Sequence, residues 1–162
     1  KQMTLLGSGG ASSAIMTQAA LDGVSKINVF ARKGNSWAVI EKQISQITKE
    51  TSCMVTLNEL ADETALKSSI ADSAILVNGS SVGMAPNTEG CLIPDTSYFH
   101  PELIVSDVIY NPQKTKLLAM AESAGLAAFN GMYMLLYQGA AGFQLWTGQE
   151  MPVDLVKQAL FS

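Results

Sequence analysis

The sequence has few of the residues that metal and disulfide chemistry require. It contains two cysteines, Cys53 and Cys91, and one histidine, His100. The cysteines lie far apart and neither has the spacing of a metal ligand, so these residues exclude a zinc site of any known type. Each cysteine is expected to be a small buried hydrophobe. A reduced, cytoplasmic location is the simplest interpretation of this cysteine usage.

Charge and long apolar runs are also scarce. Charged residues make up 15% of the sequence, and the formal net charge is -4. This balance argues against general nucleic-acid binding, which needs a basic field. No apolar run approaches the ~20 residues of a membrane-spanning helix, and no signal peptide is visible. We expect a soluble chain that binds neither nucleic acid nor membrane, and the residues indicate no particular oligomeric state.

What the sequence does have is a large apolar fraction in a length typical of one domain. Hydrophobic residues make up 48% of the 162 residues, enough to bury a core. The chain starts with Lys1 rather than Met, and a strand is predicted almost at once. We therefore expect a domain that has been cut from a longer protein.

Short apolar runs alternate with helical stretches along the chain. Strands are predicted at residues 3–6, 26–31, 53–57, 74–78, 103–107 and 127–129, and helices at 11–21, 36–49, 65–69, 114–124, 131–146 and 152–161. Strands that are apolar on both faces and separated by helices indicate a parallel sheet covered on both sides. The pattern predicts one α/β domain over residues 1–162, a doubly wound parallel sheet with helices on both faces.

A glycine-rich loop joins the first predicted strand to its helix. It consists of Gly7, Ser8, Gly9, Gly10 and Ala11. Gly7 would permit a tight turn, and Gly9 would let the backbone approach a pyrophosphate bound at the helix N-terminus. Ser12 stands where the usual third glycine would be. Such glycines can also serve a simple turn, but their place in a βαβ unit favours a dinucleotide and a Rossmann-like domain.

The residues after the second predicted strand bear on which dinucleotide would bind. They read Ala31, Arg32, Lys33 and Gly34, with no carboxylate where NAD enzymes usually place Asp or Glu for the ribose hydroxyls. Two adjacent cations suit the 2′-phosphate of NADP, although they could also be solvated turn charges. We predict NADP as the favoured cofactor and NAD as a possible one.

Three later segments resemble the shikimate dehydrogenase family, and more closely its shikimate/quinate branch. They are residues 78–84 (NGSSVGM), residues 107–112 (DVIYNP) followed by Thr115, and residues 130–140 (NGMYMLLYQGA). With the glycine loop, they have the order and spacing of that family's C-terminal NAD(P)-binding domain. The resemblance covers essentially the whole chain, and the helix containing Gln138 is its most specific element. Ala31 departs from the pattern, because asparagine is common there.

The resemblance implies roles for individual residues. Gly7 to Ala11 would hold the pyrophosphate, and residues 31–36 would surround the adenosine ribose. Ser81 would approach the cofactor. The nicotinamide half would be contacted by Val108, Tyr110, Asn111, Gly131 and Met134, and the substrate by Tyr110 and Gln138. No catalytic residue is expected here, because the family's catalytic Lys and Asp belong to an N-terminal substrate domain that is absent from these residues.

Local chemistry leaves structural alternatives for several of these side chains. Met134 could belong to the core, Tyr110 could cap the sheet edge, and Gln138 could satisfy backbone groups on a helix face. Asp107, at a strand end, is interpreted as a structural hydrogen-bonder rather than a general base. His100 is expected to be a surface loop residue.

The predicted function is the reversible NAD(P)-dependent oxidation of shikimate or quinate to its 3-dehydro ketone, a step of aromatic amino acid metabolism. The site should lie at the carboxyl ends of the strands, near the switch in strand order. One alternative is a non-catalytic dinucleotide-sensing module, which would not need Tyr110 or Gln138. Another is a methyltransferase that uses S-adenosylmethionine, which would normally need an acidic residue after the second strand.

Overall fold

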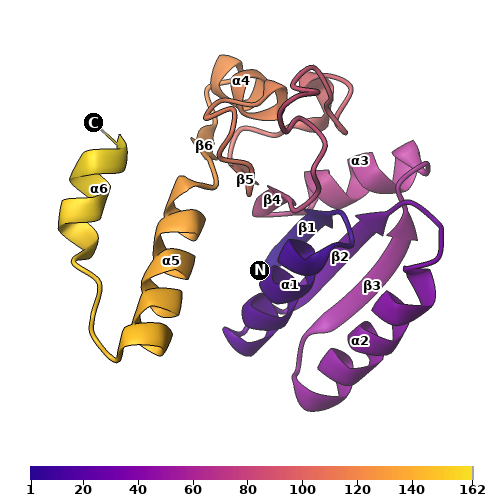
Figure 1. Ribbon diagram of the computed structural model, residues 1–162. Helices are drawn as coiled ribbons and strands as arrows, with labels where there is room; N and C mark the ends of the chain where they lie inside the picture. Colours follow the sequence, from indigo (N-terminus) through magenta and orange to yellow (C-terminus); the bar gives the residue numbers. More distant parts are fainter. Residues whose placement is uncertain (162) are drawn as a thin grey trace.

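Six parallel strands form the centre of the molecule (Figure 1). In the computed structural model, which describes residues 1–161, they are β1 (Gln2–Leu6), β2 (Lys26–Ala31), β3 (Met54–Glu59), β4 (Ile75–Asn78), β5 (Ile104–Asp107) and β6 (Ala127–Phe129). Their order across the sheet is β3-β2-β1-β4-β5-β6. The direction of winding reverses between β1 and β4, as in a dinucleotide-binding sheet. The predicted fold class is confirmed.

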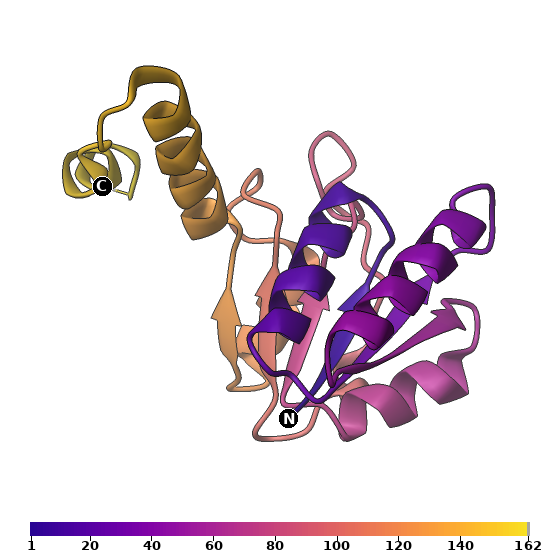
Figure 2. The same ribbon diagram turned by 90° about the horizontal axis from the view of Figure 1, so that it is seen from below.

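Helices cover both faces of this sheet. One face carries α1 (Gly10–Leu21) and α2 (Trp37–Glu50), which Figure 2 shows side by side in front of the strands. The other face carries α3 (Glu63–Ala71) and α4 (Lys116–Ser123), together with the short 3₁₀ helix η1 (Thr96–Tyr98). The sheet therefore has an apolar core on each side.

Neighbouring residues of one strand enter different cores. Leu5 packs with residues of α1 and α2, whereas Leu6 packs with residues of α3 and α4. The same division separates Val77 from Leu76 in β4. Successive side chains of a strand point to opposite faces, so a strand covered on both sides is apolar at most positions. This explains the continuous apolar runs in the sequence.

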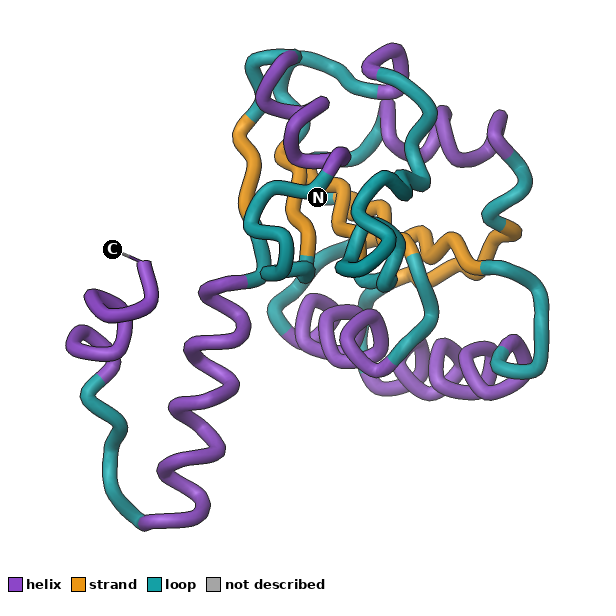
Figure 3. Tube along the Cα trace, turned by 45° about the horizontal axis from the view of Figure 1, so that its top comes forward, coloured by secondary structure: helices purple, strands orange, loops and turns teal. Residues whose placement is uncertain are grey.

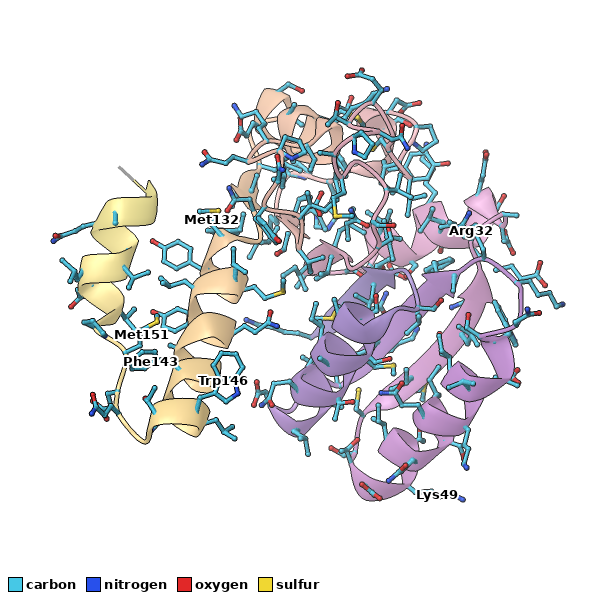
Figure 4. All side chains as sticks on the ribbon, viewed as in Figure 1. Arg32, Lys49, Met132, Phe143, Trp146 and Met151 are labelled. Carbon is cyan, nitrogen blue, oxygen red and sulfur yellow. The ribbon has the colours of Figure 1, made fainter. Side chains whose placement is uncertain are left out.

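Two C-terminal helices stand beside the sheet rather than on it. They are α5 (Met132–Thr147) and α6 (Val153–Phe161), which pack against each other (Figures 1 and 3). Phe143 and Met151 lie between the two helices, whereas Trp146 lies on the other side of α5 (Figure 4). Trp146 is 87% exposed. The helix pair therefore leaves a large aromatic side chain uncovered by the described residues.

The helix boundaries differ from the sequence prediction where polar side chains cap them. The helix expected from residue 114 begins at Lys116, because the hydroxyl of Thr115 accepts a hydrogen bond from the backbone N–H of Leu118. The one expected from residue 65 begins at Glu63, after the capping carboxylate of Asp62. The helix η1 was not predicted. Among residues 1–161, none of the helices has both the length and the apolarity needed to cross a membrane.

Candidate functional site

A cavity of about 850 Å³ opens at the carboxyl ends of the strands, across the switch between β1 and β4. This is the position at which doubly wound sheets bind ligands, and the volume is typical of small-molecule sites. Most of the predicted site residues line it: Gly7, Ser8, Gly9, Gly10, Ala11, Ala31, Arg32, Lys33, Ser81, Val108, Tyr110 and Asn111. Four loops, which follow β1, β2, β4 and β5, thus meet around one cavity.

The glycine loop after β1 has one glycine that the fold requires and one that faces open space. Gly7 has a φ of +101°, and a Cβ there would lie 3.0 Å from the backbone nitrogen of Ser80. Gly9 immediately precedes α1, and a Cβ at this position would meet no protein atom within 4 Å. The first N–H groups of a helix have no partner within it and attract anions. The loop therefore leaves room for a negatively charged group at the start of α1.

Ser12, which departs from the glycine fingerprint, is accommodated by a glycine elsewhere. Its buried hydroxyl donates a hydrogen bond of 3.1 Å to the carbonyl oxygen of Gly79. A Cβ at Gly79 would overlap the hydroxyl oxygen of Ser12. Close packing of helix and strand, which the third glycine of the fingerprint usually allows, is here provided by Gly79 on β4's loop.

We expect Gly79→Ala to destabilise the protein by about 1–3 kcal/mol, because the added methyl group overpacks the contact with Ser12. The free energy of unfolding, measured by urea denaturation, tests this. Introducing Ser12→Gly into the variant should recover part of the loss, since it removes the overlapping atoms. A Gly79→Ala variant as stable as the original chain would contradict this account of the packing.

The loop after β2 brings two cations to the cavity, but only one of them has an ionic partner. Lys33 Nζ lies 2.8 Å from Glu59 Oε1 and 5.9 Å from the centre of the Trp37 ring. The hydrogen bond to Glu59 raises the pKa of Lys33. Arg32 is exposed and forms no ion pair with the residues described. Within the described chain, no carboxylate lines the cavity.

Asp107 lies behind the cavity wall and is fully engaged by hydrogen bonds. Its carboxylate accepts from the side chain of Asn78 (3.0 Å), the backbone N–H of Ile109 (3.1 Å) and the hydroxyl of Thr115 (2.7 Å). Burial raises the pKa of Asp107, and these three hydrogen bonds oppose the increase. Asp107 is 1% exposed. Its burial and its three hydrogen bonds agree with the interpretation of Asp107 as a structural hydrogen-bonder.

Asn78 links this carboxylate to the loop after β4. Its side-chain oxygen accepts hydrogen bonds from the backbone N–H and the hydroxyl of Ser80, at 3.1 and 2.7 Å. The hydroxyl of Ser80 in turn accepts from the backbone N–H of Val82. Because Asn78 also donates to Asp107, the loops after β4 and β5 are held together. The relative position of two cavity walls is therefore fixed by buried side chains.

Three predicted residues lie outside the cavity walls. Gly131 packs behind Val108: its N–H donates to the carbonyl of Ile109 (2.9 Å), and a Cβ would overlap the Val108 carbonyl. Met134 and Gln138 lie on α5, and both are exposed. Met134 is 38% exposed, so the core alternative for this residue is wrong. The ligand contacts of these three residues stay predictions.

The cavity also includes residues that the sequence did not single out. Leu60 directly follows β3. Ligands of such sheets bind at the carboxyl ends of the strands, so its position in the sequence could have indicated it. Leu92 lies in the long segment between β4 and β5, which has no periodic pattern that would indicate it. His100 is another departure: it is half-buried, and its Nε2 lies 2.8 Å from the carbonyl oxygen of Ser73. It is therefore a structural contact rather than a simple surface residue.

Both cysteines behave as small apolar side chains. Cys53 is buried, and Cys91 is half-buried against the core beside α4. Desolvation raises the pKa of both thiols. A raised pKa keeps a thiol protonated and weakly reactive. The expectation of a buried cysteine is confirmed for Cys53, whereas Cys91 is only half-buried.

Known proteins similar to the chain include several shikimate dehydrogenases. A family model described as the shikimate 5′-dehydrogenase C-terminal domain matches residues 131–161. A shikimate dehydrogenase (NADP(+)) from Listeria monocytogenes is 47% identical over 161 residues, and one from Streptococcus uberis is 44% identical. Each match covers 99% of this chain and 55% of the relative. The chain thus spans about half the length of these curated relatives.

A solved structure adds the three-dimensional comparison. The crystal structure of shikimate 5-dehydrogenase from Listeria monocytogenes, in complex with shikimate and NAD, matches with a TM-score of 0.93 and 46% identity. The match covers 99% of this chain and 55% of that chain. The matched region includes the strands, the cavity loops and the helix pair. The chain belongs to the shikimate dehydrogenase family and corresponds to its C-terminal domain.

Proposed function

We propose that the cavity binds a nicotinamide dinucleotide, with the pyrophosphate at the start of α1. The observation that carries this proposal is the open space at Gly9, where a Cβ would meet no protein atom within 4 Å although Gly7 is tightly packed. The backbone there can approach a ligand closely, and the helix N-terminus favours an anion. The cavity is large enough for an extended cofactor that reaches the loops after β2 and β5.

In this proposal the adenosine end lies against the loop after β2, and NADP is favoured over NAD. Arg32 lines the cavity without a carboxylate partner. Its planar guanidinium can donate two hydrogen bonds to a 2′-phosphate. The relatives are named for NADP(+), and the Listeria monocytogenes structure contains NAD. We therefore assign NADP as the preferred cofactor and keep NAD as a second one.

The nicotinamide end would lie against the loop after β5, where Val108, Tyr110 and Asn111 line the cavity. The Asn78–Asp107 hydrogen bond fixes this loop, so the backbone of Val108 would hold one orientation of the ring. Hydride exchange with the carbon that bears the substrate's oxygen is the chemistry that a bound nicotinamide supplies. Tyr110, 44% exposed, would face shikimate or quinate together with Gln138, and Met134 would pack on the ring from α5.

Proton transfer is assigned to residues outside this chain. Among the described residues that line the cavity, none is a histidine or a carboxylate, and Asp107 is occupied by three hydrogen bonds. The chain matches 55% of the length of its relatives. The rest of such a relative is long enough to form a separate substrate domain. The whole enzyme would then oxidise shikimate or quinate to the 3-dehydro ketone. Reduced thiols at Cys53 and Cys91 suit a cytoplasmic location.

The chain of residues 1–162 is expected to bind NADP and NAD with one site each but not to oxidise shikimate or quinate. Calorimetric titration measures the binding, and absorbance of the reduced nicotinamide measures turnover. A full-length relative from Listeria monocytogenes serves as the positive control for both assays. Absence of binding would contradict the proposed site, whereas turnover at the rate of the full-length relative would contradict the assignment of proton transfer to another domain.

A further inference from the structure

Glu59 is a carboxylate placed beside the cofactor loop but outside the cavity wall. It is the last residue of β3, and the sheet register sets it opposite Ala31, the last residue of β2. The backbone N–H of Leu60 donates a hydrogen bond of 2.9 Å to the carbonyl of Ala31. The main chain of Glu59 is therefore anchored at the point from which Arg32 and Lys33 begin.

The side chain of Glu59 holds one of the two cations of that loop. Its Oε1 lies 2.8 Å from Lys33 Nζ, and the two side chains are 49% and 70% exposed. Lys33 lines the cavity, whereas Glu59 does not. An ion pair exposed to this degree is weak and can be exchanged for another partner. Lys33 thus lines the cavity while its ammonium group is paired with a carboxylate outside the cavity wall.

We propose that Glu59 limits the preference for NADP by competing with the 2′-phosphate for Lys33. This inference rests on the proposed binding of a dinucleotide in the cavity. The ammonium group of Lys33 has three donors, but its charge is already paired with Glu59, so it attracts the phosphate less strongly than an unpaired ammonium would. NAD has a hydroxyl in place of the phosphate. Glu59 therefore weakens the binding of NADP without affecting that of NAD.

Arg32 and Lys33 would then have different roles. Arg32 has no ionic partner among the residues described, so its guanidinium is available to a phosphate at all times. Lys33 contributes less to phosphate binding, because its charge is paired with Glu59. A site with one unpaired cation and one paired cation discriminates less between NADP and NAD than a site in which both cations are unpaired. This fits a family in which one relative is named for NADP(+) and a similar structure contains NAD.

The test is Glu59→Gln, which removes the charge and keeps the size of the side chain. We expect NADP to bind about two- to fivefold more tightly, the range that an exposed ion pair can account for. The affinity for NAD should stay unchanged. Calorimetric titration at low ionic strength measures both, because salt screens exposed charges. The matched control is Glu122→Gln, which makes the same change in the exposed Lys114–Glu122 pair (2.6 Å) and should alter neither affinity.

A second variant separates competition for Lys33 from direct repulsion of the phosphate. In a Lys33→Gln background, Glu59→Gln should no longer improve NADP binding, because the paired cation is gone. Circular dichroism checks that all variants are folded. An unchanged ratio of the two affinities in Glu59→Gln would overturn the inference, as would an equal gain in NADP affinity without Lys33. If the original chain binds neither dinucleotide, the proposed function itself fails, and the inference falls with it.

Discussion

Gly9→Val is expected to weaken the binding of both NADP and NAD by about a hundredfold or more, while the sheet stays folded. The branched side chain would occupy the space through which the pyrophosphate reaches the backbone. Overpacking typically costs about 1–3 kcal/mol, and lost hydrogen bonds to a charged group add about 1.5–3 kcal/mol. Since about 1.4 kcal/mol is a factor of ten, the combined loss of about 2.5–6 kcal/mol is roughly sixtyfold at its lower end and exceeds a hundredfold over most of its range. Both cofactors share the pyrophosphate, so both should be affected equally.

The folded state should tolerate this change because nothing in the protein opposes it. Gly9 has φ -83° and ψ -176°, an extended conformation that valine adopts readily. A Cβ at this position meets no atom within 4 Å. Gly7 offers the opposite case, since its φ of +101° and its contact with Ser80 make any side chain unfavourable. Substitution at Gly9 therefore isolates binding from folding.

Gly139→Val is the matched control, because Gly139 lies on α5, outside the cavity wall, and also has open space at its Cβ. Calorimetry gives the affinities, and thermal unfolding followed by circular dichroism gives the stability. The control should bind both dinucleotides normally. If Gly9→Val bound them as tightly as the original chain, the glycine loop would be a turn only, and the cofactor site would lie elsewhere.

Arg32→Ala should weaken NADP binding by roughly ten- to a hundredfold and leave NAD binding nearly unchanged. A hydrogen bond to a charged group contributes about 1.5–3 kcal/mol, which corresponds to that range. Arg32 is the single arginine of the sequence, so no second guanidinium can take its place. NAD carries no 2′-phosphate, so its affinity should not change. The ratio of the two affinities is therefore the decisive quantity.

Two further variants make the result specific. Arg32→Lys retains the charge but loses the planar pair of donors, so its NADP affinity should fall between those of the original chain and Arg32→Ala. Lys49→Ala removes a cation at the far end of α2 from Arg32 (Figure 4) and should change neither affinity. Raising the salt concentration should reduce the difference between the cofactors. Equal losses for NADP and NAD in Arg32→Ala, or a preference of the original chain for NAD, would refute this assignment.

Much of this protein could be predicted from its sequence because the determining patterns are local. The strands are short, largely apolar runs, and most of the sheet is buried on both faces, so the alternation of these runs with helical stretches predicts the parallel sheet. The glycine loop indicates a dinucleotide site because it follows β1 directly and leads into α1. Two helices begin two residues away from their predicted starts, because Asp62 and Thr115 cap them. Order and composition along the chain were sufficient to predict the fold class and the end of the sheet at which the cavity opens.

Only the tertiary structure decided which distant residues share a contact. Ser12 and Gly79 are 67 residues apart, and the serine fits in place of a third glycine because β4 lies next to β1. Lys33 and Glu59 are 26 residues apart, and they pair because the register of β2 and β3 sets their strand ends side by side. A local pattern contains no information on such neighbours, since strand order and register bring them together. The sequence therefore indicated two free cations after β2, and the structure showed that one of them is already paired.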